Sequence, residues 1–424
     1  MRDDGEHAEQ RALAWLFSLA DQERGVGWNP RSSVEEQWKL GRTRALLDLA
    51  DAPDRQLRVV LVAGTKGKSS TCSMLASVID AHGLRVGLYA KPHVQSYRER
   101  VRIDGQAISP HDFLEATKRV RRLVAELVRT HPEAGEPTTF EVTTALAIDV
   151  FARARCEVAV VEVGLGGRLD ATNALAPELS LITPISYDHT AILGRTLGAI
   201  ATEKAGIMRR GRPALVAHQR PTALRALRRV ARAVAAAVHV VAPLEHDVPQ
   251  PGEHQRQNAA LAIAAARCLF PVADDEIQHG LKRLRMPGRF EIMRGVVLDG
   301  AHNDASAQAL ARTLADYAQG RPISLVLGIN RDKDARAVLK PLLPLATHSV
   351  WTSQAAGNQR ALSAVELANW CRRLGATATA TPDLRAALNA ATAGGDVVCV
   401  TGSLALVGQA RTLLGAPIPE RLWD

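Results

Sequence analysis

The sequence predicts an α/β protein, with a parallel-sheet ATPase domain of the phosphate-loop type followed by a smaller Rossmann-like α/β domain. Three observations support this prediction. Short β-branched runs alternate with amphipathic helical segments along most of the 424 residues, a pattern typical of parallel sheets covered by helices on both faces. Aromatic residues make up only 4% of the chain, which indicates cores of aliphatic side chains. The length favours two domains, since a single core rarely exceeds roughly 250 residues.

A βαβ unit is predicted over residues 58–89, where a strand, a Gly-rich turn, a helix that stops at Gly83 and a second strand follow one another. Residues 25–33 are rich in Gly, Asn, Pro and Ser, and we interpret them as a candidate substrate lid. Further strands are predicted over residues 158–163, 179–185 and 214–217, and further helices over residues 11–20, 35–49, 141–154, 197–209, 222–236, 255–269 and 275–285.

The domain boundary is predicted where Pro287 and Gly288 interrupt the helical pattern, so that the first domain covers residues 1–290 and the second residues 291–424. Beyond it the alternation restarts. Strands are predicted over residues 295–299, 323–328, 349–352 and 397–401, and helices over residues 304–318, 334–343, 364–374 and after the last strand.

The net charge of +9 does not indicate a nucleic-acid partner, because the arginines are spread along the chain without interleaved aromatic residues. Solvated helix faces explain most of them. The remaining positive charge would suit an anionic small-molecule substrate, which it would attract electrostatically.

The cysteines and the amino terminus predict a cytoplasmic protein without a membrane partner. The five cysteines are scattered and lack C-x-x-C spacing, so we expect reduced thiols. The first ten residues are polar and acidic, unlike a secretory signal, and no run of 18 apolar residues occurs.

A phosphate-binding loop is predicted between the first strand and its helix, in the sequence GTKGKSS. A bound anion there would face backbone N–H groups and a helix N-terminus, and Lys68 would neutralise the terminal phosphates. Val62 stands where the general phosphate loop has its first Gly, so the loop is a variant. A simple connecting turn would need no lysine followed by hydroxyls. The predicted binding residues are Gly64, Thr65, Lys66, Gly67, Lys68, Ser69 and Ser70.

This loop and the motifs after it resemble those of the folylpolyglutamate synthase and dihydrofolate synthase family, in the Mur ligase superfamily. The motifs occur in the family's order along nearly the whole chain. They are KPH at 91–93, YRERVRIDG at 97–105, EVGLGGRLDATN at 162–173, ITPISYDH at 182–189, EKAGI at 203–207, HQ at 254–255 with Asn258, PGR at 287–289, LDGAHN at 298–303, DKD at 332–334 and TGSL at 401–404.

The resemblance implies two magnesium sites beside ATP. It assigns Glu162 to the magnesium of the nucleotide, His189 to a second magnesium, and Lys204, as a carbamylated lysine, to that second ion. Together with Lys68, His189 and Lys204 are the expected catalytic residues. Each has a plainer interpretation: a carboxylate that caps a turn, a packed histidine, and a lysine paired with Glu203 on a helix surface.

The resemblance also implies the substrate contacts. Arg289 would lie near the phosphates of ATP and Asp299 near its adenosine, with Asn258 beside them; His302 and Ser403 are candidates for glutamate binding. An aromatic residue beside a carboxylate on a helix is otherwise ordinary packing. The expected acceptor contacts, of which the first three resemble the stretch that contacts the pterin, are Thr139, Phe140, Glu141, Leu169, Asp170 and Ala171.

The implied activity is ATP-dependent addition of L-glutamate to a folate through an acyl phosphate. We expect the protein to be a monomer. Tetrahydrofolate or dihydropteroate would be the acceptor. Two alternatives stay open: a ligase of the same family that takes a non-folate carboxylate, because the pterin-facing loops match least, and a nucleotide-binding protein that has lost catalysis.

Two positions depart from the family pattern, in which Gly follows the loop lysine and the serine of S-P-H gives a hydroxyl to magnesium. Here Ser69 follows Lys68, and Lys91 replaces that serine. A protonated lysine cannot ligate a metal, so we predict that Ser69 supplies the hydroxyl instead. Lys91 would then pair with Glu162 or a phosphate oxygen, or extend into solvent.

Overall fold

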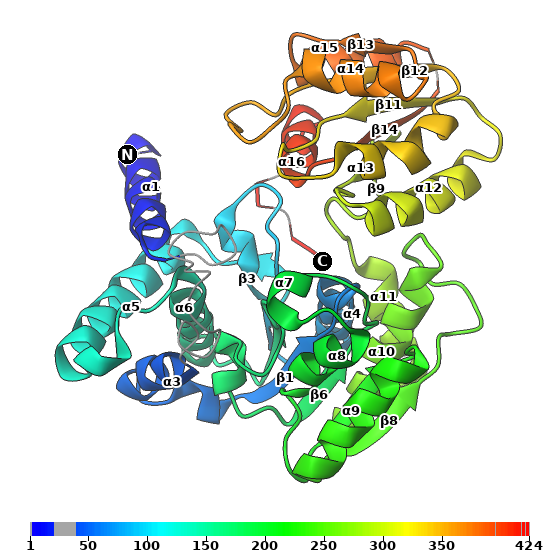
Figure 1. The fold of residues 1–424 in the computed structure, drawn as a ribbon. Coiled ribbons are helices and arrows are strands. Elements are labelled where there is room, and N and C mark those ends of the chain that lie inside the picture. Colours follow the sequence, from blue (N-terminus) through cyan, green and yellow to red (C-terminus); the bar gives the residue numbers. More distant parts are fainter. Residues whose placement is uncertain (1, 21–39, 395, 417, 420, 424) are drawn as a thin grey trace.

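The computed structural model describes residues 2–20, 40–394, 396–416, 418–419 and 421–423 (Figure 1). Two sheets, each covered by helices, follow one another along the chain, which confirms the predicted α/β class. The predicted lid at residues 25–33 and the start of the helix predicted at 35–49 lie outside the described residues. The described part of that helix is α3 (Leu40–Leu49).

The first sheet has eight strands in the order β4-β3-β2-β5-β1-β6-β7-β8. Six of them pair in parallel, whereas β3, near one edge, pairs antiparallel with both of its neighbours, β2 and β4. The strands are β1 (Arg58–Ala63), β2 (Val86–Tyr89), β3 (Val101–Ile103), β4 (Gln106–Ala107), β5 (Val158–Glu162), β6 (Leu179–Ile182), β7 (Pro213–Ala217) and β8 (Ala237–Val241).

Helices cover both faces of this sheet, and β1 shows how they divide its side chains. Val59 and Leu61 pack into one core, and Val60 and Val62 into the other, because successive side chains of a strand point to opposite faces. On the first face lie α1 (Arg2–Ser18), α3, α5 (Pro110–Thr130), α6 (Thr139–Arg153), α8 (Leu197–Ala205) and α9 (Pro221–Val234); on the second lie α4 (Lys68–Ala81), α10 (His254–Leu269) and α11 (Asp274–Arg283).

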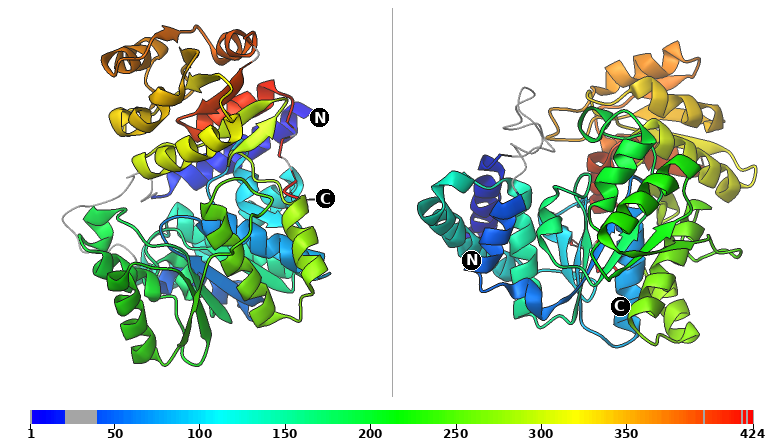
Figure 2. Two further views of the ribbon diagram at one scale, coloured as in Figure 1. Left: turned by 90° about the vertical axis from the view of Figure 1, so that its right-hand side faces the viewer. Right: turned by 60° about the horizontal axis from the view of Figure 1, so that its bottom comes forward.

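The second sheet has six strands in the order β13-β12-β11-β14-β10-β9, all parallel except β9. Its strands are β9 (Glu291–Met293), β10 (Val296–Asp299), β11 (Ile323–Leu327), β12 (Ser349–Thr352), β13 (Ala378–Ala380) and β14 (Val397–Thr401). Its helices are α12 (Asp304–Ala318), α13 (Ala335–Leu342), α14 (Ala364–Arg373), α15 (Leu384–Thr392) and α16 (Leu404–Leu413). In the view of Figure 1 this sheet and its helices, coloured yellow to red, lie above the first sheet, and Figure 2 shows them from two further directions.

The chain end returns from the second sheet to the first. Trp423 is 1% exposed, packs beneath Gly105 and donates its indole N–H to a carboxylate oxygen of Asp80 at 2.9 Å. The backbone N–H of Leu422 donates to the carbonyl of Gly105, and the carbonyl of Leu422 accepts the N–H of Arg285. The boundary at residue 290 stays a prediction; β9, the first strand of the second sheet, begins one residue later.

Several elements were not predicted, namely α5, α7 (Thr190–Leu193), α15, β3, β4, β8, β9 and β13. The strands among them have two to five residues, too few to show a clear period-two pattern. Among the described residues, no helix is long and apolar enough to cross a membrane.

Candidate active site

The loop between β1 and α4 is packed so closely that two of its residues must be glycine. Gly64 has φ 143° and Gly67 has φ 82°, both in the region that disfavours L side chains. A Cβ atom on Gly64 would lie 1.8 Å from the Thr183 hydroxyl oxygen, and one on Gly67 would lie 2.1 Å from Oδ1 of Asn258. The predicted strand, turn and helix are therefore present, with the backbone of the turn held against β6 and α10.

Two lysine ammonium groups meet at one backbone oxygen of this loop. Lys68 donates to the carbonyl of Gly64 at 3.2 Å, and Lys204, from the end of α8, donates to the same oxygen at 2.8 Å. Burial, helped by the charge of Lys68, lowers the pKa of Lys204 to about 7. The loop is thus a strongly electropositive site at the helix N-terminus.

A cleft of about 410 Å³ lies between the loop and the second sheet. It brings most of the predicted nucleotide residues together from both parts of the chain. Lys66 of the loop donates to Oδ1 of Asn303, just before α12, at 3.3 Å. The predicted residues that line the cleft are Thr65, Lys66, Gly67, Lys68, Ser69, Ser70, Glu162, Asn258, Arg289, Asp299 and His302.

Two carboxylates in this region end parallel strands; Glu162 is buried and Asp299 is half-buried. Glu162 ends β5 beside Val62 of β1, and its Oε2 accepts the backbone N–H of Lys91 at 2.9 Å. Asp299 ends β10 and accepts the backbone N–H groups of Phe290 and Ala301 at 2.8 and 2.9 Å. Burial raises the pKa of both carboxyl groups, whereas Lys68 lowers the pKa of Glu162 and Arg289 that of both.

The predicted second-metal residues lie close to the loop. His189 has φ 47° and is near the positive charges of Lys204, Lys68 and Lys91, which together with burial lower its pKa. Asp188, beside it, lines the cleft. We did not single out Asp188 from the sequence, although it precedes His189 in the ITPISYDH motif.

The second sheet contributes His302 to the cleft. Its Nδ1 lies 2.7 Å from the carbonyl oxygen of Gly300, so this nitrogen carries the proton and donates it. Nε2 is then left as an acceptor. Burial lowers the pKa of His302, which favours the neutral ring. Ser403, in contrast, is buried and caps α16 by accepting the N–H of Ala405 at 3.2 Å.

The predicted acceptor residues fall into two groups. Phe140 and Asp170 lie together, since a Cβ on Gly164 would be 2.7 Å from the ring and 2.8 Å from Asp170 Oδ2. Thr139 and Glu141 make other contacts, and none of the six predicted acceptor residues lines the 410 Å³ cleft.

Thr139 and Glu141 are engaged in the structure around the start of α6. The Thr139 hydroxyl donates to the carbonyl of Leu16 at 2.8 Å. Glu141 accepts the N–H of Thr138 at 2.7 Å and forms a buried ion pair with Arg42 at 3.0 Å. The substrate contacts of all the predicted residues stay predictions, namely those of Thr139, Phe140, Glu141, Leu169, Asp170, Ala171, His302 and Ser403.

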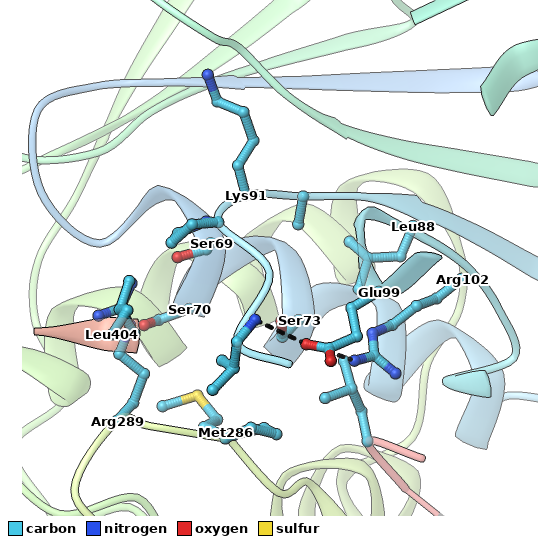
Figure 3. A pocket seen from close by; sticks show the side chains of 15 residues that line it. Ser69, Ser70, Ser73, Leu88, Lys91, Glu99, Arg102, Met286, Arg289 and Leu404 are labelled. Atoms are coloured by element: carbon cyan, nitrogen blue, oxygen red, sulfur yellow. Dashed lines mark hydrogen bonds and ion pairs between the residues drawn. The ribbon is translucent and has the colours of Figure 1, made fainter. Parts of the chain in front are cut away.

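Lys91 extends away from the loop. Figure 3 shows its side chain directed away from Ser69, Ser70 and Arg289, which line a smaller cavity of about 70 Å³ between the loop helix and the second sheet. Its ammonium nitrogen lies 4.6 Å from the ring centroid of Phe140. Lys91 was expected to pair with Glu162 or a phosphate oxygen, or to extend into solvent. In the structure its backbone N–H, and not its ammonium group, donates to Glu162, and the ammonium group lies over Phe140.

Comparison with known proteins identifies two Mur ligase regions. Residues 62–239 match the Mur ligase middle domain and residues 288–404 the Mur ligase glutamate ligase domain. The chain is 36% identical to a dihydrofolate synthase/folylpolyglutamate synthase of Mycobacterium tuberculosis, over 89% of this chain and 90% of that protein. The chain is 37% identical to a probable bifunctional folylpolyglutamate synthase/dihydropteroate synthase of Halobacterium salinarum. The matched region covers 85% of this chain and 47% of that protein.

Solved structures agree with the fold. Mycobacterium tuberculosis folylpolyglutamate synthase, solved in complex with ADP and AMPPCP, is 34% identical and superposes with a TM-score of 0.82 over 90% of this chain and 97% of that chain. E. coli FolC, in complex with DHPP and ADP, is 28% identical with a TM-score of 0.80, over 95% of this chain and 97% of that chain.

The close packing of Gly67 predicts a separable effect of substitution. Gly67→Ala should lose most of the affinity for ADP, because the new methyl group would meet Asn258 and displace the loop. Gly83→Ala is the matched control: Gly83 follows the other end of α4 with φ 89°, but nothing lies within 4 Å of its Cβ position. Urea unfolding should show a loss of about 1 kcal/mol from backbone strain in Gly83→Ala and a larger loss in Gly67→Ala, where the clash with Asn258 adds to the strain. In a nucleotide titration only Gly67→Ala should lose affinity. Equal ADP affinity in the two variants would contradict the role of the loop packing.

Proposed function

Because the chain belongs to the folylpolyglutamate synthase/dihydrofolate synthase family of Mur ligases, we propose that it is an ATP-dependent ligase that joins L-glutamate to a carboxylate of a folate. Tetrahydrofolate-type acceptors and dihydropteroate are the candidate substrates. The observation that carries this proposal is the electropositive loop around the Gly64 carbonyl, at the base of a cleft that both sheets line.

The reaction must first activate the acceptor, because a free carboxylate does not form an amide with an amine at useful yield in water. An oxygen of the acceptor carboxylate attacks the γ-phosphorus of ATP, and the bond to the β,γ-bridging oxygen breaks to release ADP. Lys68 and Arg289 stabilise the charge that develops on the phosphate oxygens. The product of this step is an acyl phosphate.

The amine of L-glutamate then attacks the acyl carbon. Phosphate leaves, the amine loses a proton, and a new amide bond remains. The neutral His302 ring and the Lys66–Asn303 hydrogen bond lie at the face of the second sheet that would receive glutamate. Exclusion of water by the enclosing cleft protects the acyl phosphate from hydrolysis.

The donor atoms around the loop fit magnesium carried by ATP. Magnesium in nucleotide sites takes its ligands from phosphates, water and one or two protein oxygens. Within the described ranges no group of three or more His, Cys, Asp and Glu side chains could hold a metal by itself. Glu162 and Ser69 would hold the first ion, whose chemistry is to neutralise negative charge on the phosphates. His189 and a carbamylated Lys204 would hold the second.

Carbamylation of Lys204 is supported by its chemistry in this fold. An amine must be neutral to add to carbon dioxide, and the pKa of about 7 leaves a substantial neutral fraction at neutral pH. The carbamate nitrogen retains one N–H, which can still donate to Gly64. The second candidate function, ligation to a non-folate carboxylate, is favoured by the engagement of Glu141 with Arg42. Cytoplasmic location, a monomeric state and the lack of nucleic-acid and membrane partners stay predictions.

Turnover is the direct test of the proposed activity. With ATP, magnesium and L-glutamate, the protein should convert tetrahydrofolate or dihydropteroate to a product that is one glutamyl residue longer, seen by mass spectrometry. Lys68→Ala should lower kcat by about 100-fold or more, because it removes a group that stabilises the transition state. Lys118→Ala, at an exposed lysine of α5 outside the cleft, should retain activity. Binding of ATP without product from either acceptor would favour a non-folate ligase or a nucleotide-binding protein.

Carbamylation can be detected without turnover. Labelled bicarbonate should add one carboxyl group to the wild-type protein, and the extent should rise with pH through about 7, because Lys204 loses its proton there. Lys204→Ala should neither take up the label nor retain activity, and small carboxylates should restore part of the activity. Lys66→Ala is the control for labelling at another amine near the loop, since Lys66 lines the cleft. This variant should still take up the label. Full activity together with an unlabelled Lys204 would overturn the assignment.

The shift of the metal hydroxyl to Ser69 predicts an altered magnesium requirement. Ser69→Gly should raise the magnesium concentration for half-maximal activity by about tenfold, as expected for loss of one protein contact. Ser69→Gly combined with Lys91→Ser should recover much of this loss. If wild type and Ser69→Gly have the same magnesium dependence, the hydroxyl is not a ligand.

A further inference from the structure

The main chain of Lys91 lies at the edge of the cleft, but its ammonium group lies over the ring of Phe140. The residue follows β2, and its backbone N–H donates to Glu162, so the main chain is fixed at the edge of the nucleotide site. From there the side chain extends away from Ser69 and Arg289 (Figure 3). The ammonium group therefore points away from the proposed phosphate contacts.

The ammonium group is directed to the side where the predicted acceptor residues Phe140 and Asp170 lie. It sits 4.6 Å from the ring centroid of Phe140, and the same ring stacks with Tyr89 at a centroid distance of 6.0 Å. The turn after β5 closes on this ring, with Asp170 next to Gly164. We name these residues, Tyr89, Phe140, Gly164 and Asp170, the acceptor patch.

The carboxylates near Lys91 already have hydrogen-bond donors. Asp170 Oδ1 accepts the N–H and hydroxyl of Thr172, and its Oδ2 accepts the N–H of Leu165. The positive charge of Lys91 lowers the pKa of both Asp170 and Glu162, so it acts within the field of both. Lys68 acts on Glu162 together with Lys91, so the region between the loop and the acceptor patch suits an additional anionic group.

We propose that the Lys91 ammonium binds a carboxylate of the acceptor and thereby contributes to acceptor specificity. The inference rests on the proposed ligase function. Its geometric basis is an amine held over Phe140, directed away from the phosphate loop and toward the acceptor patch. An ammonium group flanked by an aromatic face is well suited to a carboxylate that enters beside a ring-containing substrate.

A folate-type acceptor offers two sources of this carboxylate. Tetrahydrofolate ends in glutamate and has a reacting and a non-reacting carboxylate, whereas dihydropteroate has only the reacting one. The α-monoamide of tetrahydrofolate removes the negative charge of one of the two. These three acceptors therefore separate the sources.

Steady-state kinetics of Lys91→Met tests the proposal. Met preserves an unbranched stem over Phe140 and the backbone N–H to Glu162, but removes the charge. We expect KM for tetrahydrofolate to rise about tenfold, the size of one charge-assisted hydrogen bond at a partly exposed site, with unchanged KM for ATP and L-glutamate. Lys91→Arg should recover most of the affinity, and Lys118→Met is the control for loss of an exposed lysine outside the cleft.

The acceptors then identify the carboxylate. If it is the non-reacting one, Lys91→Met leaves KM for dihydropteroate and for the α-monoamide unchanged; if it is the reacting one, KM rises for all three. Either result supports the proposal. It is overturned if no acceptor KM changes, or if the change is confined to ATP or magnesium.

Two controls keep this outcome distinct from others. Thermal melting of Lys91→Met, with Lys91→Gln as a second uncharged variant, shows whether the fold is intact. If the wild-type protein turns over an acceptor and both uncharged variants have the same KM for that acceptor, the role of Lys91 is refuted but the proposed function is not. A wild-type protein that turns over neither folate acceptor refutes the proposed function, on which this inference depends.

Discussion

The carbonyl oxygen of Gly64 is the point on which the site depends. It accepts the ammonium groups of Lys68 and Lys204, and so joins the phosphate loop to the end of α8. This is possible only because Gly64 and Gly67 let the loop approach β6 and α10 more closely than any side chain would allow. The two lysines are therefore positioned by backbone packing, and the helix N-terminus adds its own positive potential.

Strand ends supply the acidic groups that balance this charge. Glu162 and Asp299 end strands in different sheets, and backbone N–H groups hold both carboxylates in place. In open α/β sheets the carboxyl ends of the strands are where ligands bind. Here two such edges face one cleft, so the chemistry of ATP and that of the second substrate can be provided by separate sheets.

The two sheets are held to each other by contacts far apart in the sequence. Arg411 of α16 is fully buried, pairs with Glu291 and donates to Gln95 of the first part. Trp423 then anchors the chain end beside Asp80. The part of the chain that contains the second sheet is therefore attached to the first part at two places, the segment before β9 and the segment around Trp423. Any movement of the second sheet relative to the first is limited by both attachments.

The sequence by itself determined the order of most strands and helices, the phosphate loop and the grouping of Lys68, Glu162 and Arg289 at one site. The elements and the phosphate loop are encoded locally, by the apolar period and by residue types at fixed spacing, whereas the expected grouping of Lys68 with Glu162 and Arg289 came from the resemblance of the motifs to the family. Only the tertiary structure decided what depends on distant partners: the antiparallel edge of β3 and β4, the pairing of Glu141 with Arg42, the docking of Trp423 under Gly105, and the direction of Lys91. Each of these joins segments whose sequences carry no signal of one another, because side-chain partners across a fold are set by packing and burial, whereas local patterns set only the elements themselves.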